Sequence, residues 1–231
     1  MAIDLVQHKD MLIKILKDIY PDAELSGTLG FKGGTAAMLF YGLNRFSVDL
    51  DFDILNFDLL DESKENIIID KVSDILKNYG TIKEARNKRY NIFFLLRYDS
   101  ALKNAQNIKV EINKRNFGSK YDTRSYLGLP IDVMTQADMA AHKLVAMYER
   151  MSQANRDIYD VWFFLQNGWP INKQIIEMRT QMKYPDFLQK CIDGLENLEG
   201  HSFLSGLGEL LDEKQKYWVK TKLKNETIFL L

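Results

Sequence analysis

The sequence lacks the features that mark secreted and membrane proteins. Its 231 residues include one cysteine, Cys191, which excludes an internal disulfide framework. No apolar run approaches the ~20 residues that a membrane-spanning helix needs. Charged residues recur every few positions within residues 1–20, unlike the continuous apolar core of a signal peptide. We therefore expect a cytoplasmic protein that is not embedded in a membrane.

An excess of charge of one sign is also missing. Lysine and arginine total 31 and aspartate and glutamate total 32, so the formal net charge is -1. Such a chain has no net field that gathers nucleic acid or anionic membranes, and any contact with a polyanion must be local. With 46% hydrophobic residues, the composition suits a globular protein with a substantial core.

The hydrophobic spacing indicates two kinds of structure along the chain. Helical periodicity and helix-ending glycines predict helices over residues 3–19, 34–43 and 61–79. Alternating or branched residues predict strands over 48–54, 81–86, 90–97 and 108–114. From residue 135 the pattern is helical, over 135–151, 155–166, 172–182 and onward. We expect an α+β fold: a sheet with flanking helices in residues 1–130, followed by a helical domain in 131–231.

The stretch FKGGTAAMLFYGLNRFSVDLDFDIL, residues 31–55, ends in an unusual strand. Alternation predicts that its apolar residues face the core and its acidic residues face the other way; the acidic set is Asp49, Asp51 and Asp53. Like charges roughly 6–7 Å apart raise one another's pKa and cost stability. A bound Mg²⁺, which is coordinated by carboxylate oxygens, is one way to offset this repulsion. An exposed edge strand with a solvated acidic face is the alternative.

The same stretch begins with a turn that suits a phosphate. Gly33 and Gly34 let the backbone approach a ligand closely. Thr35 adds a hydroxyl to the amide donors at the positive end of the following helix. A plain turn and helix cap is the alternative. Because the turn and the acidic strand belong to one helix-to-strand unit, the two features can share a ligand.

The segment KGGTAAMLFYGLNRFSVDLDFD resembles the signature of AbiEii/AbiGii-type toxins, a family of the nucleotidyltransferase superfamily with a DNA polymerase β-like core. The resemblance implies a nucleotidyltransferase-like mixed sheet. It implies that Asp49 and Asp51 hold Mg²⁺, and that a turn binds the nucleoside triphosphate: Lys32, Gly33, Gly34 and Thr35. The chain departs from the pattern in having Gly34-Thr35 in place of the superfamily serine, and in the additional Asp53.

The superfamily also needs a third carboxylate on a neighbouring strand, as a base or a further metal ligand. In IKVEINKR, residues 108–115, alternation places Glu111 on the face opposite the apolar residues. Glu111 is therefore the candidate. A solvated glutamate between two lysines is the alternative.

The helical part contains TQADMAAHKLVAMYERMSQANRDIYDVWFFLQNG, residues 135–168. Thr135 and Asp138 fit a helix-capping box. The toxin family has an aspartate followed five positions later by lysine, and Asp138 with Lys143 matches that spacing. The resemblance implies that Lys143 contacts the nucleotide phosphates as a point charge.

Two further acidic residues, Asp157 and Asp160, lie three apart and share one helix face. The segment resembles the family motif Arg-Asp-x-x-Asp, in which either aspartate could orient the nucleotide or Lys143. We favour Asp157 as the catalytic residue and Asp160 as a nucleotide-binding residue. A salt-bridge network with Arg150 or Arg156, which only ties two helices together, is the alternative.

The resemblance implies an enzyme that transfers a nucleoside monophosphate from an NTP, GTP or another, to an acceptor hydroxyl. It also implies a toxin of a toxin–antitoxin or abortive-infection system, with tRNA as acceptor and a cognate antitoxin as partner. Basic clusters with nearby aromatic residues suit RNA, and charged strand ends and turns that are simply solvated are the alternative. The aromatic residues are Tyr90, Phe117 and Tyr121, and the basic residues are Lys83, Arg86, Lys88, Arg89, Lys109, Lys114, Arg115, Lys120 and Arg124. A small-molecule or protein acceptor, and a non-catalytic NTP-binding regulator, are the alternatives.

Overall fold

The computed structural model describes residues 4–56, 58, 60–99, 105–151, 153–198 and 202–231. Two compact units make up the chain. The sheet unit holds residues up to 116 together with 121–134, and the helical unit holds 117–120 together with 135–231. The sequence-based division at residues 130/131 falls inside the last strand of the sheet unit, which continues to Met134.

The sheet unit is built on seven described strands in the order β3-β4-β5-β2-β1-β7-β6. Their bounds are β1 Leu29–Lys32, β2 Leu50–Ile54, β3 Thr81–Asn87, β4 Asn91–Asp99, β5 Ala105–Asn113, β6 Tyr121–Tyr126 and β7 Leu129–Met134. The β2–β5 and β1–β7 pairs are parallel and the other pairs are antiparallel. The predicted mixed sheet with flanking helices is therefore confirmed.

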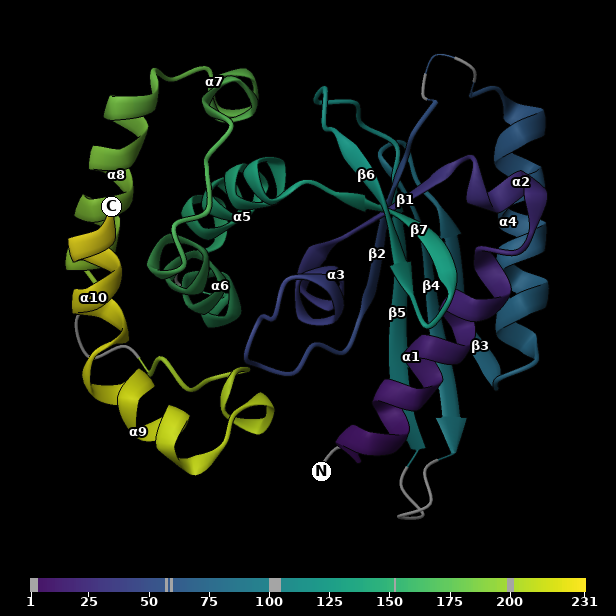
Figure 1. Cartoon of the computed structure of the whole chain (residues 1–231), viewed down its shortest axis with the longest axis horizontal. Coiled ribbons are helices and arrows are strands. Elements are labelled where there is room, and N and C mark those ends of the chain that lie inside the picture. The colour runs from purple at the N-terminus through teal and green to yellow at the C-terminus, as the bar shows by residue number, and fades with distance from the viewer. Residues whose placement is uncertain (1–3, 57, 59, 100–104, 152, 199–201) are drawn as a thin grey trace. The chain divides into compact units, whose positions relative to one another are not determined.

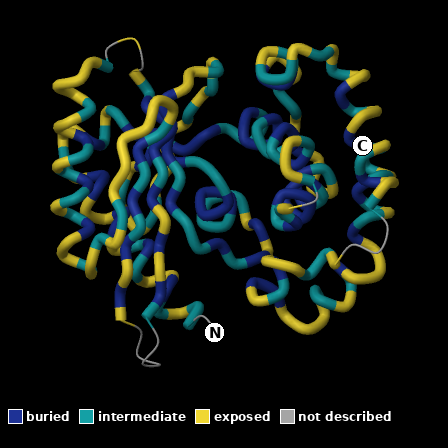
Figure 2. Tube along the Cα trace, turned by 180° about the vertical axis from the view of Figure 1, so that it is seen from behind, coloured by how far each residue is buried: buried dark blue, intermediate teal, exposed yellow. Residues whose placement is uncertain are grey.

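Four α-helices of the described residues accompany the sheet: α1 Leu5–Ile19, α2 Ala23–Ser26, α3 Gly33–Phe40 and α4 Glu62–Lys77. Figure 1 shows α2 and α4 together on one side of the sheet. The apolar face has Leu50 and Phe52 of β2 in register with Val110 and Ile112 of β5, and all four are fully buried. Figure 2 shows the buried positions along the central strands. The predicted inward direction of the apolar residues of β2 is confirmed.

Three strands, β1, β6 and β7, were not predicted because their sequences have weak strand signals. β1 has four residues and includes Gly30, while β6 is almost wholly polar and exposed. The β6–β7 turn places Leu127 at φ 52° and Gly128 at φ 83°. Two-residue hairpin turns of this kind usually have Asn-Gly or Asp-Gly, so Leu127 gives no turn signal.

Gly80 was predicted to end α4, but this interpretation is wrong. The helix ends at Lys77 with Asn78 as its C-cap, and Gly80 is not at positive φ. A Cβ added to Gly80 would lie 2.2 Å from the carbonyl oxygen of Arg97. The residue is glycine because the β4 backbone passes very close to it.

The helical unit contains α5 Gln136–Arg150, α6 Asn155–Gln166, α7 Lys173–Thr180, α8 Tyr184–Glu196, a 3₁₀ turn Gly208–Leu210, α9 Glu213–Thr221 and α10 Leu223–Leu230 (Figure 1). Its apolar interior is largely supplied by α5 and α6, and α6 begins and ends where the sequence predicts. Within the described ranges, no helix combines the length and hydropathy that a membrane crossing requires.

Candidate active site

The acidic residues of β2 lie in two cross-strand rows on one face of the sheet. Asp51 pairs in register with Lys32 of β1 and with Glu111 of β5. Asp53 pairs with Gly30 of β1 and with Asn113 of β5. Register partners project from the same side of a sheet, about 5 Å apart. The sheet thus brings Asp51 and Glu111 together, as the sequence predicts.

The glycine turn lies directly against Asp51. Gly33 has φ +78°, and a Cβ added there would be 2.3 Å from Asp51 Oδ2. A Cβ on the buried Gly34 would be 2.7 Å from Ser47 Oγ. Any larger residue at position 33 would collide with the carboxylate. The two glycines therefore allow the turn and the acidic strand to form one compact structure.

Asp49 lies just before β2, which begins at Leu50 rather than at the predicted Val48. The fully buried Thr35 donates its hydroxyl hydrogen to the Asp49 carbonyl oxygen. Nε2 of His8 in α1 lies 2.9 Å from the Val48 carbonyl oxygen. Side chains from α1 and α3 thus contact two successive carbonyls, and these contacts fix the backbone of the loop at Asp49.

Asp53, to which the sequence assigns no role, binds other side chains of the sheet. It is buried and accepts hydrogen bonds from Lys32 Nζ, from Asn113 Nδ2 at 2.7 Å and from the Tyr121 hydroxyl. Lys32, a predicted nucleotide-binding residue, is therefore held by Asp53 in this structure. Asp53 neutralises the lysine beside the turn.

Glu111 is half-buried and has a neutral neighbour. Its Oε1 accepts a hydrogen bond from Asn91 Nδ2 at 2.8 Å. Within the described part of the chain, Oε2 of Glu111 makes no hydrogen bond or ion pair with the protein. One carboxylate oxygen is therefore positioned by β4, while the other can accept a proton or a cation.

A complete metal site is not preformed. Among the described residues, no group of three or more His, Cys, Asp or Glu side chains is arranged to hold a metal ion. Asp51 and Glu111 nevertheless supply neighbouring carboxylates, and Gly33 leaves room at Asp51 Oδ2. This donor set fits a hard divalent cation that completes its shell with water and substrate phosphate oxygens.

The helical unit has a separate charged cluster that links α5 to α6. Lys143 Nζ lies 3.0 Å from Asp157 Oδ1 and 3.1 Å from Asp160 Oδ2. Arg150 Nη2 lies 2.7 Å from Asp157 Oδ2. The Asp157 and Asp160 side chains are 4% and 0% exposed, against 16% for Lys143. The predicted trio of Lys143, Asp157 and Asp160 therefore comes together, with Arg150 as a fourth member.

Asp138 does not form the predicted capping box. Thr135 is the N-cap of α5, but its side chain makes no cap hydrogen bond. The buried Asp138 instead accepts hydrogen bonds from the Lys120 backbone amide and from Asn172 Nδ2, the latter at 2.7 Å. Asp138 therefore ties the segment 117–120 and the start of α7 to α5.

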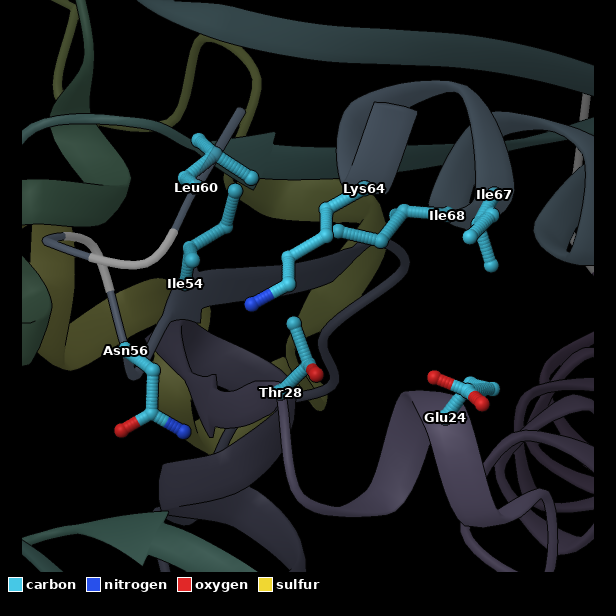
Figure 3. Close-up of a pocket in the computed structure, with 8 residues that line it drawn as sticks. All are labelled: Glu24, Thr28, Ile54, Asn56, Leu60, Lys64, Ile67 and Ile68. Carbon is cyan, nitrogen blue, oxygen red and sulfur yellow. The ribbon is translucent and has the colours of Figure 1, made fainter. Parts of the chain in front are cut away.

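The sheet unit also has a small pocket, which is lined by residues that do not belong to the candidate site. It encloses about 150 Å³, and Figure 3 shows the Lys64 amine reaching toward its centre. Its lining residues are Glu24, Thr28, Ile54, Asn56, Leu60, Lys64, Ile67 and Ile68. Ligand pockets usually enclose roughly 300–1,000 Å³. This pocket is too small for a nucleotide and contains none of the predicted site residues.

The family relationship follows from a match along most of the sequence. The family model described as nucleotidyl transferase AbiEii toxin, type IV TA system, matches residues 14–206. The chain belongs to the AbiEii family. The resemblance inferred from residues 32–53 is thereby confirmed, and so is the class of enzyme, a nucleotidyltransferase of a toxin family. Comparison with curated proteins gave no significant match.

Solved structures with low sequence identity share the AbiEii-family fold. A structure from H. pylori described as a putative nucleotidyltransferase has a TM-score of 0.59 and 17% identity, covering 100% of this chain and 96% of that one. JHP933 from Helicobacter pylori has a TM-score of 0.58 and 18% identity, covering 100% and 93%. MenT4, a nucleotidyltransferase toxin from Mycobacterium tuberculosis, has a TM-score of 0.57 and 18% identity, covering 98% and 88%.

Several residues around the candidate site were missed by sequence reasoning. Asn113 could have been found, because it lies two positions after Glu111 and so shares its face of the strand. Asn91, Tyr121 and His8 come from other elements. Their positions depend on strand order and helix packing, for which the sequence has no local signal.

Proposed function

We propose that this AbiEii-family chain transfers a nucleoside monophosphate from an NTP to a hydroxyl of tRNA in an Mg²⁺-dependent reaction, with GTP as the first donor to test. It acts in the cytoplasm as the toxin of a toxin–antitoxin pair and is inhibited by a cognate antitoxin protein. The observation that supports the transfer most strongly is the contact between the Gly33 turn and Asp51, with Glu111 in register beside it.

The turn and the helix after it suit the triphosphate. Lys32 occupies the N-cap position of α3, and its side chain makes no cap hydrogen bond. Backbone amides at a helix N-terminus, with the helix dipole behind them, attract phosphate oxygens. Gly33 and Gly34 keep side chains away from that position. We assign the triphosphate to the turn formed by Lys32, Gly33, Gly34 and Thr35.

Asp49 and Asp51 are the metal ligands in this proposal, with Glu111 as a third. Bound Mg²⁺ would neutralise the triphosphate and lower the pKa of the attacking hydroxyl. Glu111 Oε2 takes the proton of that hydroxyl, while Asn91 holds Oε1. The acceptor oxygen forms a bond to the α-phosphorus, and the bond from the α-phosphorus to the pyrophosphate oxygen breaks.

Lys143 contributes positive charge to the phosphates, and Asp157 and Asp160 orient it. The supporting observation is that both carboxylates lie within 3.1 Å of Lys143 Nζ, while the lysine side chain keeps 16% exposure. A positioned ammonium stabilises the charge that develops on the leaving pyrophosphate.

The test is incubation of the purified protein with each α-³²P-labelled NTP, Mg²⁺ and total bacterial tRNA. An Asp49→Ala/Asp51→Ala variant is the matched control. We expect label on tRNA with the wild type alone, and the labelled base identifies the donor. Absence of transfer to tRNA with every NTP, although the triphosphate binds, would refute the tRNA assignment. A small-molecule or protein acceptor would then be tested with the same label.

A further inference from the structure

We propose that the β3–β4 turn is a subsite for one unpaired nucleotide of an RNA acceptor, which stacks on Tyr90 between Arg89 and Arg115. This inference rests on the proposed function, because it assigns the acceptor's contact with the sheet unit. The turn comprises Lys88, Arg89 and Tyr90, all of them exposed, and it connects β3 to β4.

Tyr90 forms an exposed aromatic surface beside two guanidinium groups. Tyr90 is 52% exposed, so its ring is accessible to a ligand from solution. The guanidinium carbons of Arg89 and Arg115 lie 5.1 and 5.8 Å from the Tyr90 ring centroid. The Lys88 amine lies 6.0 Å from the Phe93 ring centroid. Aromatic faces and basic groups alternate over this turn and the strand that follows.

Hydrogen bonds hold these groups in position. The Lys114 amide donates to the Tyr90 carbonyl oxygen at 2.9 Å, and the Lys88 amide donates to the Asn91 carbonyl oxygen at 2.9 Å. Arg115 Nε donates to Asn113 Oδ1 at 3.0 Å, and Asn113 Nδ2 donates back to the Arg115 carbonyl oxygen at 2.9 Å. The turn and Arg115 are therefore fixed to the end of β5.

The same residues connect the turn to the carboxylates. Asn91, which follows Tyr90, donates to Glu111, and Asn113 donates to Asp53. One cross-strand row runs over the sheet face from β3 to β1: Arg86, Phe93, Glu111, Asp51 and Lys32. The row begins with basic and aromatic residues, passes through the two carboxylates and ends beside the glycine turn. An acceptor bound at the β3–β4 turn thus approaches Glu111 from the side opposite the triphosphate.

The chemistry of this cluster favours a single-stranded nucleotide over other ligands. Every base presents a π-face that can stack on tyrosine or on a guanidinium plane, and arginine also binds the adjoining phosphate. The whole protein has a formal net charge of -1, so this positive charge is local. In a base-paired duplex the π-faces are already stacked, so the subsite selects unpaired residues.

The test compares RNA binding by Tyr90→Ala, Tyr90→Phe and wild type, without NTP or metal. The probe is a fluorescein-labelled single-stranded RNA of six nucleotides, with a blunt RNA duplex as the second probe, and fluorescence anisotropy gives the Kd. We expect Tyr90→Ala to weaken binding of the single strand roughly 10- to 100-fold, the range found for removing one stacking side chain. Tyr90→Phe keeps wild-type affinity, because stacking needs the ring and not the hydroxyl.

Tyr217→Ala is the matched control, since Tyr217 is 72% exposed in α9 of the helical unit. We expect it to bind the single strand as the wild type does. Arg89→Ala and Arg115→Ala each lower the slope of log Kd against log salt by about 0.7 if the arginine neutralises one phosphate. Equal affinity of Tyr90→Ala and wild type for the single strand would overturn the subsite, and so would a wild type that binds no single strand.

The labelled-NTP assay separates failure of the subsite from failure of the proposed function. Transfer to tRNA by the wild type, with an unchanged KM for tRNA in Tyr90→Ala, would overturn the subsite and leave the transfer standing. Tyr90-dependent binding of the single strand, without transfer to any RNA, would support the subsite and refute the proposed reaction. If this turn instead binds an acidic protein partner, that partner competes with RNA equally well on the wild type and on Tyr90→Ala. Such a result would also overturn the proposal.

Discussion

The carboxylates of the sheet unit and those of the helical unit have opposite surroundings. Glu111 is half-buried, and its partner among the described residues is the neutral amide of Asn91. Asp157 and Asp160 are almost fully buried, and both lie within 3.1 Å of Lys143 Nζ. A buried carboxylate must be compensated by the protein itself, whereas a half-buried one can be compensated by a cation from solution. In the proposed function the sheet face serves the reaction, and the burial of Asp157 and Asp160 against Lys143 indicates that the helical cluster maintains the fold.

The largest effect is expected from Asp51→Asn. The substitution keeps the size of the side chain but removes the charge beside the Gly33 turn, so transfer should fall by on the order of 10³-fold, as when one charge-stabilising group is lost. Because Asp51 is half-buried, the thermal unfolding midpoint should stay within about 2 °C, a change below about 1 kcal/mol. Initial rates of label transfer and a thermal scan measure the two quantities.

The control for this variant is Asp122→Asn, an exposed carboxylate of β6 that should leave both quantities unchanged. Residual transfer by Asp51→Asn above a tenth of the wild-type rate would remove Asp51 from the reaction centre.

The helical cluster is tested by Lys143→Met. The substitution keeps the apolar stem but leaves Asp157 and Asp160 without their shared ammonium, and loss of one partner of a buried pair costs about 3–5 kcal/mol. Lys183→Met is the matched control, because Lys183 is 80% exposed and lies 3.8 Å from Glu177. Such a surface pair contributes about 0–1 kcal/mol.

Urea denaturation of both lysine variants gives the free energy of unfolding. If both variants lose the same free energy of unfolding, the helical cluster contributes no more to stability than a surface ion pair. The contrast between the carboxylates of the two units would then fail.

The two positive-φ glycines flanking α3 give a finer comparison. Gly33 has φ +78° and Gly42 has φ +73°, so alanine at either position costs backbone energy of roughly 1 kcal/mol. A Cβ on Gly33 would also meet Asp51 Oδ2, while one on Gly42 meets nothing within 4 Å. We expect Gly33→Ala to lose more stability than Gly42→Ala because its Cβ meets Asp51, and only Gly33→Ala to lose transfer, by at least tenfold.

The rates of transfer by the two glycine variants at several Mg²⁺ concentrations measure this difference. A Gly42→Ala variant as inactive as Gly33→Ala would show that backbone strain, and not contact with Asp51, explains the loss.

The smallest effect is expected at Cys191, which lies outside both charged clusters. Burial raises the pKa of its thiol to about 12, so the native protein keeps the thiol neutral at pH 8. Iodoacetamide should label it only after unfolding. Because the folded-state pKa lies above the unfolded value of about 8.5, the stability from this group is complete below that pH and is lost as the pH rises toward 12.

Mass spectrometry after alkylation of native and urea-unfolded protein checks the reactivity of Cys191. Rapid labelling of the native chain would show that this part of α8 is open to solvent. The interior of the helical unit would then be too accessible to water to bury Asp157 and Asp160.

Local patterns were sufficient for much of the fold. The bounds of α6 follow from helical periodicity, and the alternation in β2 predicts the burial of Leu50, Phe52 and Ile54 but not that of Asp53 on the opposite face. The pairing of Lys32 with Asp53 was not predictable, because it requires β1 to lie antiparallel beside β2, and β1 itself has only four residues. The positions of Asn91 and Tyr121 were not predictable either, because they depend on the order of the strands in the sheet.

The sequence itself places the carboxylates and glycines of the candidate site in one continuous segment, which contains Gly33, Gly34, Asp49 and Asp51. It could not show that Thr35 donates its hydroxyl hydrogen to the Asp49 carbonyl, or that His8 approaches the preceding carbonyl. Both contacts depend on how a helix packs against the loop before β2, and that packing is a property of the whole sheet unit.

The central claim is that Asp51 and the Gly33 turn form one site for a divalent cation and a triphosphate. Calorimetric titration with a GTP analogue that has a methylene group between its α- and β-phosphorus atoms, with and without Mg²⁺, tests it most directly. We expect Mg²⁺-dependent binding by the wild type and at least tenfold weaker binding by Asp51→Asn. Equal affinity of the two proteins for the analogue in the presence of Mg²⁺ would contradict it.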